Sequence, residues 1–119
     1  MPRASNSVAS RNRRKKILRS AKGYWGGKSK LLRTAKDAVR KSLSYAYRDR
    51  KARKRDFRRL WITRIGIAAK NEGLSYSKLI KGLKDANIEL NRKILAEIAV
   101  HHEKAFSQLS KIAMSGDKS

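Results

Sequence analysis

Residues 28–65 read KSKLLRTAKDAVRKSLSYAYRDRKARKRDFRRLWITRI, a run of 38 residues without glycine or proline. Apolar residues recur in it at helical spacing, from Leu31 to Ala46 and again from Phe57 to Ile65. A helix over this run would be about 57 Å long at 1.5 Å per residue, which is wider than a domain of this size. The run therefore predicts one long helix that projects from a small body or lies along another molecule.

Charge is distributed unevenly along the 119-residue chain, which has 32 Lys and Arg residues against 9 Asp and Glu. Residues 1–60 hold 22 basic and 3 acidic side chains, whereas residues 61–119 hold 10 and 6. A formal net charge of +23 makes the isolated chain repel itself, so a polyanion is its natural complement. We expect a basic extension over residues 1–59 and a globular domain over residues 60–119, which has enough apolar residues for a small core.

The rest of the chain also follows helical patterns, and no strand pattern competes with them. Ser10 is expected to cap a first helix that runs to about Lys22, after an extended arm over residues 1–9. Gly23 and the pair Gly26-Gly27 then break the chain, and the long helix that follows is expected to end in a cap at Gly73.

Three shorter helices are expected in the globular half. The first of these helices is expected to be capped by Ser75, to run to about Ala86 and to be terminated by Asn87. The second is expected to be capped by Asn91. The last is expected from about His102 to Met114. The residues predicted to face the core are Trp61, Ile62, Ile65, Leu79, Ile80, Leu83, Ile94, Leu95, Ile98, Ala99, Phe106, Leu109, Ile112 and Ala113. The fold class is therefore all-α, with a long basic N-terminal helical extension and a small C-terminal helical bundle.

Composition argues against enzyme and metal chemistry. Cysteine is absent, which excludes disulfides, thiolate metal sites and cysteine nucleophiles. The adjacent pair His101-His102 diverges on a helix and has no third ligand nearby, so we expect a helix-start or loop role. No enzyme activity, metal or cofactor is predicted, and no apolar run approaches the roughly 18 residues of a membrane span.

Two acidic residues of the long helix resemble a catalytic pair only at first sight. Asp49 and Asp56 are seven residues apart and share a helix face. Arg53 and Arg59 lie four and three positions after them, so ion pairs are the better interpretation.

The densest basic segment runs from Arg48 to Arg59. At 100° per residue its cations surround the helix, and a helix that is charged on all sides cannot pack into its own protein core. Arginine dominates, and arginine binds phosphate bidentately and stacks on bases. This pattern favours burial within folded nucleic acid, and the alternative is a charged helix that is merely solvated. Tyr45 and Tyr47, just before it, point to different faces, so one is expected to stack on RNA and the other to pack.

A second basic cluster lies between Arg11 and Arg19, and taken alone it also fits a localisation signal. The loop Gly23-Tyr24-Trp25-Gly26-Gly27 follows it. Its glycines allow close approach to phosphate and its aromatic rings can stack on unpaired bases; the alternative is that both rings pack on nearby helices. The predicted RNA-binding residues are Arg11, Arg13, Arg14, Lys15, Lys16, Arg19, Lys22, Tyr24, Trp25, Lys28, Lys30, Arg48, Arg50, Lys51, Arg53, Lys54, Arg55, Arg58 and Arg59.

These motifs together resemble the bacterial-type large-subunit ribosomal protein family L-twenty. The resemblance rests on Tyr45-Ala46-Tyr47-Arg48-Asp49-Arg50, on Lys54-Arg55-Asp56-Phe57-Arg58-Arg59-Leu60-Trp61-Ile62, and on Arg64-Ile65. Flanking matches are Arg13-Arg14-Lys15-Lys16, Ala21-Lys22-Gly23-Tyr24, Gly73-Leu74-Ser75-Tyr76-Ser77, Gly82-Leu83, Asn91-Arg92-Lys93 and Leu95-Ala96. The resemblance covers nearly the whole chain and keeps the order and spacing of the family.

The resemblance implies a structural protein of the large ribosomal subunit that binds 23S-type ribosomal RNA directly and acts early in subunit assembly. It implies the large-subunit proteins numbered thirteen and twenty-one as neighbours and, in some bacteria, repression of the protein's own mRNA. The expected location is the ribosome in the bacterial cytoplasm, with an organellar ribosome left open; no membrane and no DNA partner are expected.

Two other classes of function are compatible with the composition alone. A DNA-compacting protein would normally wrap DNA through a dimeric body, and no dimer face is evident in the sequence. A membrane-active cationic peptide needs a helix with a wide apolar face, which the segment from Arg48 to Arg59 lacks.

Overall fold

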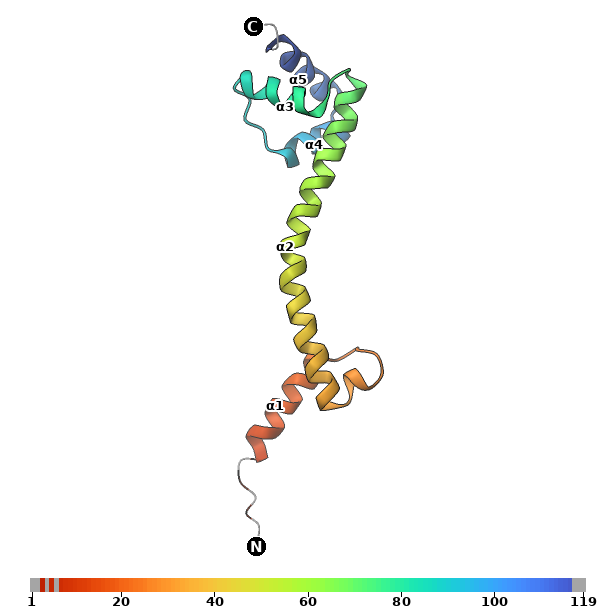
Figure 1. The fold of residues 1–119 in the computed structure, drawn as a ribbon, viewed down its shortest axis with the longest axis vertical. Coiled ribbons are helices and arrows are strands. Elements are labelled where there is room, and N and C mark those ends of the chain that lie inside the picture. Colours follow the sequence, from red (N-terminus) through yellow and green to blue (C-terminus); the bar gives the residue numbers. More distant parts are fainter. Residues whose placement is uncertain (1–2, 4, 6, 117–119) are drawn as a thin grey trace. The chain divides into compact units, whose positions relative to one another are not determined.

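The computed structural model describes residues 3, 5 and 7–116 and contains only helices in that part of the chain. The all-α prediction is therefore confirmed. The chain forms two compact units, residues 1–51 and 52–119, and one helix runs from the first into the second. The elements, in the order that Figure 1 shows, are α1 (Ser7–Ser20), the 3₁₀ helix η1 (Gly26–Ser29), α2 (Leu32–Asn71), α3 (Tyr76–Asp85), α4 (Arg92–His101) and α5 (Glu103–Gly116).

The N-terminal helix begins earlier than the sequence predicts. Ser10 was the expected cap, but α1 already includes Ser7, so Ser10 lies inside the first turns. Part of the expected arm, residues 1, 2, 4 and 6, lies outside the described residues. The long helix begins later than expected, because Lys28 belongs to η1 and α2 starts at Leu32.

Tertiary contacts hold the first unit together around small side chains. Ala21, just after α1, and Ala35, in the first turn of α2, are both fully buried. The loop between them is tied to α2 twice. Tyr24 donates its hydroxyl to Ser42 Oγ at 2.8 Å, and Thr34 Oγ1 donates to the Gly27 carbonyl at 2.8 Å.

The predicted C-terminal cap of α2 is confirmed. Gly73 has a φ of +80°, which a glycine adopts without strain. The Leu74 amide donates to the Ala69 carbonyl at 2.8 Å, and the Gly73 amide donates to the Lys70 carbonyl at 3.0 Å. This pair of bonds is a Schellman motif, which satisfies carbonyls that the end of a helix would otherwise leave free.

The caps of α3 and α4 also match the sequence. Ser75 Oγ accepts from the Lys78 amide at 3.3 Å, and Asn91 Oδ1 accepts from the Ile94 amide at 2.9 Å. Asn87 ends the turn after α3 with a φ of +56°, a conformation that asparagine tolerates better than most residues.

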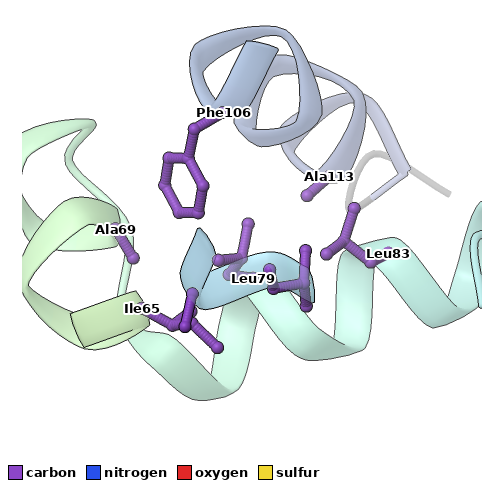
Figure 2. Packing of buried hydrophobic residues seen from close by; sticks show 8 residues of the cluster. Ile65, Ala69, Leu79, Leu83, Phe106 and Ala113 are labelled. Atoms are coloured by element: carbon purple, nitrogen blue, oxygen red, sulfur yellow. The ribbon is translucent and has the colours of Figure 1, made fainter. Parts of the chain in front are cut away.

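The second unit encloses the main hydrophobic core. Figure 2 shows side chains from α2, α3 and α5 converging on one another. The Phe106 ring points from α5 toward the side of the core where Ala69 of α2 lies. Trp61 and Ile98 are partly buried against this core. The buried cluster comprises Ile65, Ala69, Leu79, Leu83, Leu95, Ala96, Phe106 and Ala113.

Two of the predicted core positions are exposed, and a third, Ile62, is partly buried but does not belong to the core cluster. Ile94 is 41% exposed, and Ala96 on the same helix is buried instead. Ile112 is 43% exposed, whereas Ser110, which the hydrophobic pattern passes over, is fully buried in α5. Both errors have one cause: periodicity fixes the direction of the apolar face only approximately, and the neighbouring helices decide which flank of that face is covered.

Candidate RNA-binding surface

The basic segment of α2 exposes its cations to solvent. Every residue from Arg53 to Leu60 is exposed, as are the three cations Arg48, Arg50 and Lys51 before Ala52. The part of this segment in the second unit carries five cations. Successive residues of a helix are rotated by about 100° about its axis, so these cations point in several directions around it. These are Arg53, Lys54, Arg55, Arg58 and Arg59. The segment therefore packs into no core of its own unit, as the sequence predicts.

Acidic residues neutralise little of this charge. Asp56 pairs with Arg59 at 3.8 Å, which confirms that predicted pair. Asp49 pairs with its neighbour Arg48 at 3.1 Å instead of with the predicted Arg53. Because Asp49 pairs with Arg48, it does not pair with Arg53, and the Arg53 guanidinium is left exposed to solvent. Both pairs are exposed and contribute little to stability.

Two exposed tyrosines lie on α2 just before this segment. The sequence suggested that one of the pair Tyr45 and Tyr47 packs, but both are exposed. Each ring is covered by a cation of the same helix: Arg48 Cζ lies 4.5 Å from the Tyr45 centroid and Lys51 Nζ lies 4.5 Å from the Tyr47 centroid. A cation over an aromatic face is attracted by the ring quadrupole, so these contacts pre-orient two of the candidate RNA-binding cations.

The first unit carries the second set of candidates. All of the predicted basic residues of α1 and of the following loop are exposed: Arg11, Arg13, Arg14, Lys15, Lys16, Arg19, Lys22, Lys28 and Lys30. Trp25 is exposed as well, whereas Tyr24 is half-buried. Of the 19 predicted residues, Tyr24 is therefore the only one that is not exposed.

Further cations, outside the two predicted basic clusters, lie on the same helix. Arg33, Lys36, Arg40 and Lys41 are exposed on α2 within the first unit. Of these, Arg40 is 4.0 Å from Asp37. In the sequence they do not form a recognisable cluster, because they are spread between apolar residues rather than grouped in a run. Their common exposure makes them additional candidates for phosphate contact.

Metal-binding groups and membrane-spanning helices are both absent from the described part of the chain. Within residues 3, 5 and 7–116, no three His, Cys, Asp or Glu side chains lie together in a way that could hold a metal ion. No described helix combines the length and apolar character that crossing a bilayer requires. His101 is the last residue of α4 and His102 lies between α4 and α5, with its carbonyl accepting the Phe106 amide at 3.0 Å.

Comparison with known proteins gives a single consistent result. The profile of the family described as Ribosomal protein L20 matches residues 3–109. The chain is 62% identical over 113 residues to the "Large ribosomal subunit protein bL20" of Carboxydothermus hydrogenoformans, which covers 95% of this chain and 97% of the relative. Proteins of the same name from a Thermoanaerobacter species and from Pelotomaculum thermopropionicum are both 63% identical; each alignment covers 95% of this chain, and 95% and 97% of the respective relative.

Proposed function

Because the chain belongs to the ribosomal protein L20 family, we propose that it is a structural component of the large ribosomal subunit that binds 23S-type ribosomal RNA directly. The family is one of ribosomal structural proteins, and the chain is not an enzyme. The proposal assigns RNA binding to residues 1–59 and anchoring to a globular domain of residues 60–119.

One observation carries the proposal: the cations of α2 from Arg53 to Arg59 are all exposed and lie around the helix axis, and Arg48, Arg50 and Lys51 before them are exposed as well. Like charges at helical spacing repel one another. RNA phosphates on several sides would remove that repulsion and would release the counterions that had screened them. Fixed cations then replace mobile ones, and a compact RNA fold is stabilised.

The finer parts of the proposal come from the family resemblance. The protein acts early in subunit assembly, beside the large-subunit proteins numbered thirteen and twenty-one. It also represses translation of its own mRNA where that messenger imitates the ribosomal RNA site. It works in the ribosome of a bacterial cytoplasm or of an organelle.

The test compares binding to large-subunit ribosomal RNA fragments with binding to duplex DNA of the same length over a salt series. We expect one RNA fragment to stay bound at salt concentrations that release the DNA. If the affinities for RNA and for DNA instead fell together, with the same steep dependence on salt, binding would be counterion release alone. The claim of a specific RNA site would then be withdrawn.

A pair of charge variants locates the RNA contact. The double variant Arg53→Gln, Arg55→Gln should reduce the slope of log affinity against log salt by about 2, or about 1 for each lost phosphate contact. The control Lys78→Gln, Lys111→Gln removes the same charge from exposed positions of α3 and α5. An equal effect of the two variants would contradict the assignment of RNA binding to the basic segment.

A further inference from the structure

The loop between α1 and α2 places two neighbouring aromatic residues in different environments. Tyr24 is half-buried and its hydroxyl donates to Ser42 Oγ at 2.8 Å, so its ring serves the protein's own packing. Trp25 is 89% exposed, although tryptophan is among the more highly buried residues on average. The sequence left open whether both rings pack or both bind, and the structure separates them.

The backbone that presents Trp25 is held in a defined conformation. Trp25 is extended, with φ −71° and ψ 136°, and it lies between two glycines with positive φ, Gly23 at +89° and Gly26 at +61°. Ser29 Oγ donates to the Gly26 carbonyl at 3.0 Å, directly after the exposed indole. The indole therefore projects from a loop that is held by hydrogen bonds (the orange segment before α2 in Figure 1). Less conformational entropy is lost when a ligand binds to a loop that is already ordered.

A shallow basic hollow, wide open to solvent, lies beside this loop. It has a volume of about 480 Å³ and is lined by residues of α1, of the loop and of η1. Gly23 and Ser29 form part of its wall, so the segment that carries Trp25 also borders the hollow. Four of the seven lining residues are cations: Lys15, Arg19, Lys22 and Lys30.

The charge of the hollow is not neutralised within the described residues. The only acidic residues in residues 1–60 are Asp37, Asp49 and Asp56. Each of them pairs with an arginine of α2 and none with a cation of the hollow. An anion is therefore the ligand that this hollow favours, and the loop that borders it also carries the exposed indole of Trp25.

We propose that this loop and hollow form a binding site for an unpaired stretch of RNA, in which Trp25 stacks on one base while the four cations contact the flanking phosphates. The proposal rests on the proposed RNA-binding function and specifies its ligand. A base within a duplex is covered on both faces by its neighbours, so the stacked base belongs to a loop, bulge or strand end. Every base has a π-face, so stacking gives affinity without strong sequence preference.

The test uses the full-length chain and large-subunit ribosomal RNA fragments. In a Trp61→Phe background, Trp25 is the only tryptophan, so its fluorescence reports its own environment. We expect RNA to quench this fluorescence. We also expect Trp25→Leu to weaken RNA binding by about 10- to 100-fold without changing the salt dependence, because no phosphate contact is lost. Trp25→Phe retains an aromatic face and should restore most of the affinity.

A second pair of variants tests the hollow and controls for general surface effects. Lys15→Gln with Lys22→Gln should make the salt dependence shallower by about 2 and leave quenching of Trp25 detectable at low salt. Leu43→Ala removes another exposed apolar side chain of the same unit and should have no effect on RNA binding. Because Trp25 is so exposed, circular dichroism should show unchanged helicity in the Trp25 variants.

The results that would overturn the proposal are distinct from those that would overturn the proposed function. RNA binding of normal affinity by Trp25→Leu, without quenching in the unaltered loop, would overturn the stacking site and leave RNA binding intact. If the same variant instead lost association with a ribosomal protein, Trp25 would be a protein contact and the proposal would also be wrong. Failure of the unaltered chain to bind any fragment would overturn both.

Discussion

Gly82 of α3 faces Ala113 of α5 so closely that position 82 has no room for a β-carbon. A β-carbon built there would lie 2.8 Å from the Ala113 Cα and from its carbonyl carbon, a separation that real side chains do not tolerate. The contact is with backbone, which cannot rotate away. The two helices can therefore approach each other only because residue 82 is glycine.

The first prediction follows directly from this contact. Gly82→Ala should lower the free energy of unfolding by about 1–3 kcal/mol, since the two backbones must separate. Gly66→Ala is the matched control, because Gly66 lies within α2 with nothing within 4 Å of an added β-carbon. It should stabilise the protein by up to about 1 kcal/mol, the difference in helix propensity. Urea denaturation followed by circular dichroism measures the free energy of unfolding of both variants. If both variants were stabilised, or both destabilised, the packing argument would be wrong.

A second prediction concerns the cap of α3. Ser75→Ala removes the oxygen that accepts the Lys78 amide and should cost about 1 kcal/mol of stability. Ser77→Ala makes the same change two residues later, at an exposed position inside the helix, where alanine is the better helix former. The same denaturation experiment should show a loss for the first variant and none for the second. A loss in both would mean that the hydroxyl of Ser75 has no special role.

The third prediction tests the hydrogen bond that ties the loop between α1 and α2 to α2. Tyr24→Phe deletes the hydroxyl that donates to Ser42 and should destabilise the loop by about 1 kcal/mol. Tyr47→Phe deletes an exposed hydroxyl on the same helix as Ser42 and serves as the control. Amide hydrogen exchange of residues 24–31 should accelerate about fivefold for the first variant. Equal exchange rates in the two variants would show that the loop is held by other contacts.

The fourth prediction addresses the proposed domain boundary. Residues 60–119 should fold without the basic extension, because every member of the buried core cluster lies between Ile65 and Ala113. Thermal unfolding of this fragment should be cooperative by circular dichroism. Leu79→Ala in the fragment should cost about 2–5 kcal/mol, because Leu79 is fully buried. A fragment that melts without cooperativity would place the boundary earlier in α2.

Much of the fold was predictable because it depends on local chemistry. Ser75, Asn91 and the glycine at position 73 act on amides and carbonyls within a few residues of themselves, so their roles follow from residue type and spacing. The start of α1 is predicted four residues too late: with Ser10 as its cap the helix would begin at Arg11, whereas it begins at Ser7, and helix ends are the least sharply specified points.

The candidate site divides in the same way. A run such as Arg48 to Arg59 has no apolar face, and its exposure follows from composition alone. The pairing of Asp49 with Arg48 rather than with Arg53 is a choice between side-chain conformers of similar energy, which spacing does not decide.

The sequence by itself therefore determined the helices, the caps at Gly73, Ser75 and Asn91 and the surrounding positive charge, because each depends on residues near in the chain. The tertiary structure decided which of two adjacent aromatic residues is free. Tyr24 and Trp25 are both aromatic, but the Tyr24 hydroxyl bonds to Ser42, 18 residues away along the chain, whereas Trp25 is left exposed. It likewise decided that Ser110 is buried and Ile112 is not, since burial depends on which neighbouring helix covers each flank.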